Sequence, residues 1–174
     1  MVLYSSKTGN TEKVAQAIRL GLEEAGVQVT MKKPKAAAEI DYFNFDLVCV
    51  GSPAIQWHPT KHMDDFLKAK MAEYRKKGKI KPTAPKIAGK NVLVFVTYAG
   101  PHTGMDEATP VGKYLGQFFA HVGFNILDEW YILGEYHGNE ENSTQGRMGD
   151  VRGKPTIEEL QKVQEDARAL AGRI

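Results

Sequence analysis

Apolar residues occur along the chain in two patterns that alternate with few exceptions. Short, nearly continuous apolar runs rich in Val, Ile and Leu predict strands, and such runs are typical of a parallel sheet buried on both faces. The predicted strands are Val2–Ser5, Val27–Met31, Asp46–Val50, Asn91–Tyr98 and Asn125–Tyr136, with a bend or bulge expected near Asp128–Glu129 in the last one.

Other segments carry apolar residues at every third or fourth position, which is the spacing of one helix face. Helices are predicted over Thr11–Ala25, His62–Tyr74, Gly112–Val122 and Pro155–Leu170. In the last helix Thr156 is the expected N-cap, and the residues expected to face inward are Ile157, Leu160, Val163 and Ala167. This alternation predicts an α/β fold, a three-layer sandwich in which right-handed crossovers place helices on both faces of a five-stranded parallel sheet.

The composition is that of an ordinary globular protein. The 174 residues are enough for one domain, expected over 1–174, and 42% of them are hydrophobic and 25% charged. We expect a cytoplasmic protein with no membrane span, because no apolar run approaches the ~20 residues that a spanning helix needs and no leader pattern is visible. Cys49 is the only cysteine and is expected to be a buried strand residue.

The positive charge is concentrated in one part of the chain. Between Lys61 and Lys90 there are ten basic and three acidic residues, a net charge of +7, against +2 for the whole chain. Such a patch can steer an acidic partner, but the favoured interpretation is a solvated helix end followed by a loop over Lys76–Lys90. No recognition motif accompanies the charge, so we expect no nucleic-acid binding.

The segment Ser6-Lys7-Thr8-Gly9-Asn10-Thr11 has the composition of an anion site. It connects the first predicted strand to the first predicted helix, whose leading N–H groups lack partners within the helix and carry partial positive charge. The hydroxyl and amide side chains add donors, and Gly9 lets the backbone approach a ligand closely. The segment matches neither the Walker loop nor the dinucleotide fingerprint. It therefore predicts a phosphate held mostly by neutral donors, the alternative being a simple Ser/Thr-rich helix cap.

Two further loops are expected at the same edge of the sheet. Gly51–Pro59 follows the third strand and Thr97–Gly104 follows the fourth, and each combines an aromatic residue with small, Gly and Pro positions. A flat conjugated ring needs aromatic or apolar walls and a few backbone hydrogen bonds at its rim. Trp57 and Tyr98 are the candidate walls, and packing against a helix or a neighbouring subunit is the alternative for Trp57.

The three loops, in this order and approximate spacing, resemble the FMN loops of the flavodoxin superfamily. Gly51-Ser52-Pro53, with Pro59 and Met63 after it, looks like the WrbA-type NAD(P)H:quinone reductase branch. The resemblance implies FMN as the cofactor and the strand order 2-1-3-4-5 known for flavodoxin itself. It implies a cofactor site made of Ser6, Lys7, Thr8, Gly9, Asn10, Thr11, Pro53, Ala54, Ile55, Trp57, Thr97, Tyr98, Ala99, Gly100 and His102.

The chain departs from the carrier flavodoxins in two respects. Those proteins are usually strongly acidic, whereas this chain has a net charge of +2. Their second loop often has a Gly whose peptide turns toward the flavin when it is half-reduced, and Ala54–His58 contains none. Because φ > 0 costs more for other residues, we expect weaker stabilisation of the half-reduced flavin, which favours two-electron chemistry.

The histidines and the long last connection leave several interpretations open. His102 is a weak candidate for proton transfer, a solvated loop histidine being the favoured interpretation, and no spacing of His or Cys predicts a metal site. The glycine-rich segment from His137 to Lys154 is expected to be a lid, a partner surface, a subunit contact or disordered.

Taken together, these features predict an electron-transfer protein that passes electrons to a redox partner protein or a small quinone-like acceptor. An NAD(P)H-dependent quinone or flavin reductase is the first alternative, and a flavin-free binding module on the same fold is the second. Flavodoxin-like protoporphyrinogen oxidases remain a further open class. Both a monomer and a homo-oligomer are compatible with the sequence.

Overall fold

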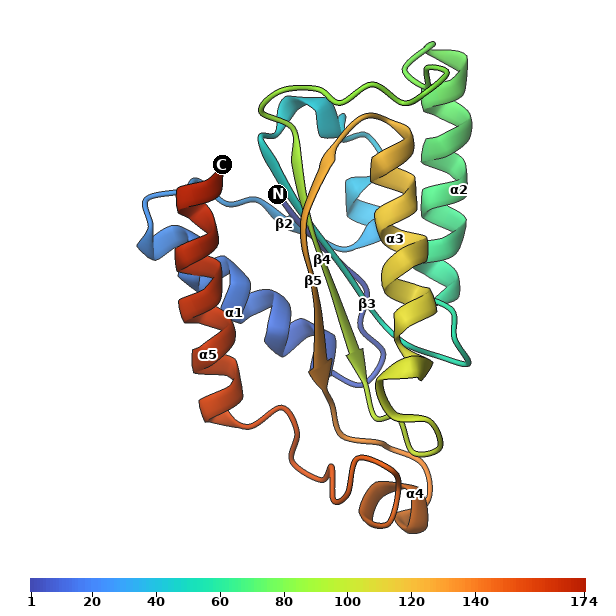
Figure 1. Cartoon of the computed structure of the whole chain (residues 1–174), viewed down its shortest axis with the longest axis vertical. Coiled ribbons are helices and arrows are strands. Elements are labelled where there is room, and N and C mark those ends of the chain that lie inside the picture. Colours follow the sequence, from blue (N-terminus) through green and yellow to red (C-terminus); the bar gives the residue numbers. More distant parts are fainter.

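A computed structural model describes all 174 residues and contains one five-stranded parallel sheet of order β2-β1-β3-β4-β5 (Figure 1). The predicted α/β sandwich and the 2-1-3-4-5 order are therefore confirmed. The strands are β1 (Val2–Tyr4), β2 (Met31–Lys32), β3 (Leu47–Pro53), β4 (Asn91–Tyr98) and β5 (Asn125–Leu133).

Helices cover both faces of the sheet (Figure 1). Helices α1 (Asn10–Glu24) and α5 (Ile157–Leu170) lie on one face, and α2 (Lys61–Lys76) and α3 (Thr109–His121) lie on the other. The side chains of β4 alternate between two buried clusters, with Val94 and Val96 facing α2 and α3, and Leu93 and Phe95 facing α1 and α5. The sheet thus separates two apolar cores, as expected for a three-layer sandwich.

Helix α5 begins with a capping box in which Thr156 Oγ1 accepts from Glu159 N and the Glu159 carboxylate accepts from Thr156 N. The predicted N-cap is confirmed. Ile157, however, does not face inward: 72% of it is exposed, because the first turn of α5 extends beyond the sheet (Figure 1). Farther along, Gly21 of α1 lets the two helices touch, since a Cβ there would lie 2.1 Å from the Gln164 carbonyl oxygen.

The second and third strands differ from the sequence-based boundaries. Residues 27–30 are not in a strand, because the Val27 N–H donates back to Leu22 O to close α1 and β2 pairs with β1 at only two positions. The third strand continues through Gly51-Ser52-Pro53, which was expected to be loop. Gly51 makes this possible, because a Cβ there would overlap the Phe95 ring at 2.1 Å.

The last strand and the connection after it also differ in detail. In the pairing of β4 with β5, Val92 lies opposite Ile126 but the next residue, Leu93, lies opposite Asp128, so Leu127 has no partner in β4. The predicted irregularity in the last strand is therefore confirmed. Strand β5 ends at Leu133, three residues earlier than predicted. The connection contains α4 (Glu140–Thr144) and lies beyond the carboxyl end of the sheet (Figure 1).

This connection is packed against the rest of the protein. Ser143 is buried and its hydroxyl donates to Tyr136 O, while Val151 N donates to Ser143 O at 2.8 Å. Arg147 N donates to Pro101 O at 2.8 Å, which fixes the connection to the loop after β4. The structure therefore contradicts the alternative that this connection is disordered.

None of the helices has the length and apolar character required to span a bilayer.

Candidate functional site

A cavity of about 780 Å³ lies at the carboxyl edge of the sheet, among the loops that follow β1, β3, β4 and β5. In the 2-1-3-4-5 order the chain moves outward in opposite directions from β1 and β3, which leaves a crevice between the loops at this point. The cavity therefore occupies the place where open α/β sheets bind ligands.

The loop after β1 presents free backbone donors to this cavity. The N–H groups of Lys7, Thr8, Asn10 and Thr11 have no acceptor within the protein. Gly9 has φ 101°, a conformation that a Cβ would oppose, and its N–H donates to Ser6 Oγ at 3.1 Å. Free N–H groups at the start of α1 form an anion-binding concavity, and Lys7 adds the only cation of this loop.

The one acidic residue in the first turn of α1 is held away from this concavity. Glu12 accepts a 2.6 Å hydrogen bond from Tyr4 Oη and pairs with Lys33 Nζ at 3.3 Å. The tyrosine hydrogen bond lowers the pKa of Glu12, while burial and the carboxylate raise the pKa of Tyr4 to about 12. Glu12 stays charged, and its carboxylate is bound to Tyr4 and Lys33. It therefore does not enter the site where an anion would bind.

Two polar residues of the same loop connect it to the sheet. Thr11 Oγ1 lies 2.7 Å from Thr97 Oγ1 at the end of β4, and both side chains are buried. Asn10 Nδ2 donates to Glu135 O, after β5, at 3.0 Å. The hydroxyl of Thr11 is thus used inside the protein, and the side-chain hydroxyls left for a ligand are those of Ser6 and Thr8.

The loop after β3 makes a two-residue hairpin turn. Ile55 N donates to His58 O at 2.9 Å and His58 N donates to Ile55 O at 3.0 Å. The central residues Gln56 and Trp57 have φ of 48° and 66°, so both are in the left-handed region without being glycine. This loop therefore adopts positive φ without a Gly. The conformation costs roughly 1–3 kcal/mol per residue, in line with the sequence-based expectation that positive φ is more costly here.

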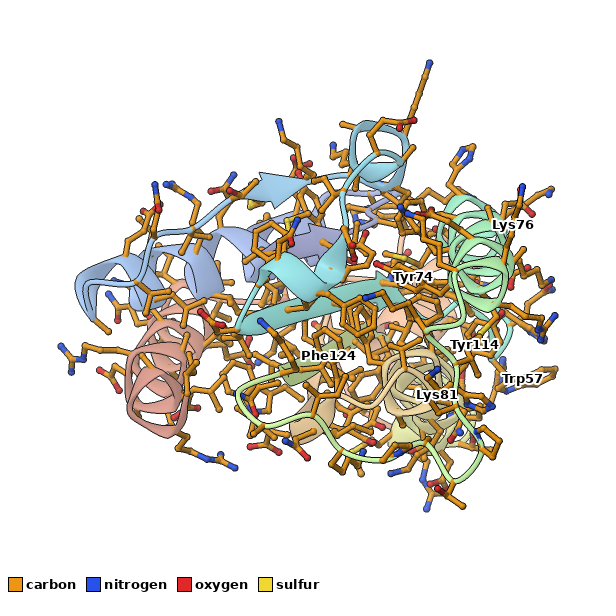
Figure 2. All side chains as sticks on the ribbon, turned by 90° about the horizontal axis from the view of Figure 1, so that it is seen from above. Trp57, Tyr74, Lys76, Lys81, Tyr114 and Phe124 are labelled. Atoms are coloured by element: carbon orange, nitrogen blue, oxygen red, sulfur yellow. The ribbon has the colours of Figure 1, made fainter.

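The turn places Trp57 at the rim of the cavity. Its side chain is 60% exposed and projects away from the body of the protein (Figure 2). Pro53, Ala54 and Ile55 line the cavity below it. An exposed indole next to a cavity is available to cover a flat ligand.

The loop after β4 is fixed by its own backbone and by one carboxylate. Glu107 Oε1 accepts from both His102 N and Thr103 N at 2.8 Å. Gly100 has φ 57°, and a Cβ there would lie 2.5 Å from the Gly104 carbonyl oxygen, so this tight turn requires glycine. His102 lines the cavity and is exposed.

Tyr98, the second residue predicted to contact the ring, is more buried than Trp57. Only 8% of it is exposed, it belongs to the core facing α2 and α3, and burial raises its pKa. It nevertheless lines the cavity, so it presents one edge to a ligand and remains a neutral hydrogen-bond donor.

The structure brings twelve of the fifteen predicted site residues to the wall of this cavity. Ser6 and Gly9 belong to the same loop but are not part of the cavity wall, and the Thr11 hydroxyl is turned into the protein. Sequence reasoning missed Gln56, Pro101, Thr103, Glu107 and residues 134–138. Of the last group, residues 134–136 were assigned to the last strand and residues 137–138 to the connection after it, although β5 lies beside β4 and its carboxyl end must reach the same edge.

The sequence and structure are similar to those of known flavodoxin-like proteins. The Flavodoxin domain family matches residues 1–80. A protein named NAD(P)H dehydrogenase (quinone) from Archaeoglobus fulgidus is 26% identical over 167 residues, with 79% of this chain and 82% of that protein covered. Together with the sheet order, these findings agree on a flavodoxin-like family.

Solved structures show the same fold at low sequence identity. Oxidised Flavodoxin 2 from Bacillus cereus superposes with a TM-score of 0.68 at 19% identity, covering 99% of this chain and 97% of that one. The flavodoxin, WrbA-like protein from Agrobacterium tumefaciens gives 0.60 at 14% identity, covering 99% and 94%. A flavodoxin and a WrbA-like protein, the two groups that the sequence resembles, thus share this architecture.

Proposed function

We propose that the cavity binds one FMN and that the protein transfers electrons through it. The observation that carries this proposal is the position of the free N–H donors of the first loop in the same cavity as Trp57 and Tyr98. This donor set suits a phosphate, because it is neutral apart from Lys7 and has no carboxylate turned into it. The apolar and aromatic residues of the other loops suit a flat ring.

In this proposal the phosphate is held by Ser6, Thr8 and the backbone of Lys7, Thr8, Asn10 and Thr11. Pro53, Ala54, Ile55 and Trp57 cover one side of the ring, and Thr97, Tyr98, Ala99 and Gly100 lie along its rim. FMN, when bound, supplies the reversible redox chemistry. The residues of this chain orient it and exclude water from part of its surface.

Our first assignment is electron transfer to a redox partner protein or a small quinone-like acceptor. It rests on the lack of a readable dinucleotide fingerprint in the sequence. The second assignment is an NAD(P)H-dependent quinone reductase, which the name of the Archaeoglobus fulgidus relative favours. In that case His102, exposed at the cavity, is the candidate for delivering a proton.

An anaerobic absorbance titration of the FMN-loaded protein distinguishes these assignments. Rapid bleaching by NADH or NADPH in one two-electron step indicates a reductase. No response to either nucleotide, followed by a half-reduced flavin during dithionite addition, indicates an electron carrier. A protein that remains colourless in the presence of FMN is instead a binding module on this fold, and both assignments are then wrong.

A further inference from the structure

A second cavity, of about 370 Å³, lies at the opposite end of the sheet from the first. It is bordered by the loop that precedes β4, by the residues between α3 and β5, and by Phe43 in the short helical turn before β3. These are the amino ends of the strands, and Figure 2 looks onto this end, where Lys81 and Phe124 are labelled. The proposed FMN site contributes no residue to this cavity.

The lining combines apolar surface with cations and contains no acidic residue. Phe43, Ile87 and Val122 provide apolar side chains, and Lys79, Lys81 and His121 provide polar ones. Lys79 Nζ lies 4.6 Å from the centroid of the Phe43 ring, so its ammonium group is held at the cavity by a cation–π contact. Lys81 makes no ion pair.

The ion pairs of the basic segment explain why positive charge remains at this end. The three acids of the basic segment and Asp46 pair with other lysines: Asp64 with Lys68, Asp65 with Lys61, Glu73 with both Lys70 and Lys77, and Asp46 with Lys90. The basic residues without a carboxylate partner are Arg75, Lys76, Lys79, Lys81 and Lys86. Two of these residues, Lys79 and Lys81, line the second cavity, and none of the five lines the first.

The loop that forms one wall is fixed before any ligand arrives. Ile87 N donates to Gly123 O at 2.9 Å, and Lys86 Nζ donates to Phe124 O at 2.7 Å. Gly123 permits this contact, because a Cβ there would lie 2.6 Å from Pro85 O. Since Lys86 is engaged with the backbone, Lys79 and Lys81 are the cations left to meet a ligand, and little ordering is needed on binding.

We propose that this cavity binds a small aryl anion, with the ring against Phe43, Ile87 and Val122 and the anionic group at Lys79 and Lys81. Charge complementarity selects an anion, because two lysines line the cavity and no acidic residue does. The apolar side chains select an aryl body over a purely hydrated ion. Carboxylate and phosphate share the recognised chemistry, and benzoate is the simplest probe that contains both features.

The test is a titration of the full chain with benzoate, followed by backbone amide NMR. We expect saturable shifts at Gly78, Lys81, Val122 and Gly123, and none at these positions with benzamide, the neutral isostere, or with acetate, which lacks the ring. Lys79→Gln and Lys81→Gln should each weaken benzoate binding by about tenfold, the loss of one charge-assisted contact. Lys68→Gln, which removes a cation paired with Asp64 outside the cavity, should leave the affinity unchanged.

Several results would overturn the proposal. Shifts confined to Gly100 and Gly134 would place benzoate in the first cavity. If benzamide binds as tightly as benzoate, the charge of the ligand does not contribute to binding. If both lysine variants keep the affinity for benzoate, Lys79 and Lys81 do not hold the anionic group. Absence of saturable shifts would show that the cavity takes no aryl anion. None of these results depends on whether the first cavity binds FMN.

Discussion

Thr11 Oγ1 and Thr97 Oγ1 lie 2.7 Å apart in the interior of the protein and join the start of α1 to the end of β4. The contact connects two loops that the sequence separates by 86 positions and that line one cavity. Thr11 therefore positions the first loop, whereas Thr8, exposed in the same loop, is free to meet a ligand.

Replacing each threonine by valine should separate these two roles. Thr11→Val leaves the buried Thr97 hydroxyl without a partner and should lower the free energy of unfolding by ~1–3 kcal/mol. Thr8→Val should leave stability unchanged and weaken FMN binding by about tenfold while sparing riboflavin, which has no phosphate. Urea unfolding and flavin titrations measure both quantities. Equal losses of FMN and riboflavin in Thr8→Val would remove Thr8 from the phosphate site.

Replacing Trp57 should weaken the binding of FMN and of riboflavin equally, because its proposed contact is with the ring that the two flavins share. We expect Trp57→Leu to weaken FMN and riboflavin by the same factor, roughly 3- to 10-fold, which is the range for aromatic stacking. Trp130→Phe is the matched control, since Trp130 is partly buried against the core on the α1 and α5 side and does not line the cavity. A Trp57 variant with unaltered affinity for both flavins would show that the indole does not cover the ring.

The turn at Gln56 and Trp57 carries conformational strain that a glycine would relieve. Gln56→Gly should raise the free energy of unfolding of the flavin-free protein by roughly 0.5–1 kcal/mol, because the φ of 48° costs glycine little. The matched control is Lys13→Gly on the exposed face of α1, which should lower stability by about 1 kcal/mol. If both variants lose stability alike, Gln56 is not strained.

Cys49 should be unreactive over the ordinary pH range. Burial in β3 raises the pKa of its thiol to about 12, so alkylation of the native protein should stay slow from pH 7 to 9. In urea the unfolded thiol, with a pKa near ~8.5, should react faster as pH rises. Because the folded pKa is the higher one, the thiol's contribution to stability is complete below about pH 8.5 and falls above it. Cys49→Val should abolish this decline, and fast labelling of the native protein would contradict the burial.

The sequence predicted those features of the site that depend on local pattern. A hydroxyl-rich turn between an apolar run and a helical period identifies the first loop, and alternation of strands and helices places the other loops at the same edge. Twelve of fifteen proposed residues line the cavity for this reason. The strand order came from the family resemblance, because pattern alone does not order strands.

Features that depend on distant contacts escaped prediction. The partner of Thr11 is Thr97, and no local pattern distinguishes a buried hydroxyl from one that faces a ligand. The left-handed turn at Gln56 lacks the glycine that would announce it. Ile157 fits the helical period but lies in the first turn of α5, where it is 72% exposed. Residues 134–136 were assigned to a strand because strand propensity does not show where the chain leaves its neighbour.

The most direct test of the central claim is an equilibrium titration of the flavin-free protein with FMN and with riboflavin, followed by flavin fluorescence. The proposed site predicts quenching that saturates at one FMN per chain, with riboflavin bound much more weakly because it leaves the free N–H groups of the first loop unused. Unquenched FMN would contradict the claim outright. Equal affinity for the two flavins would show that the first loop is not a phosphate site.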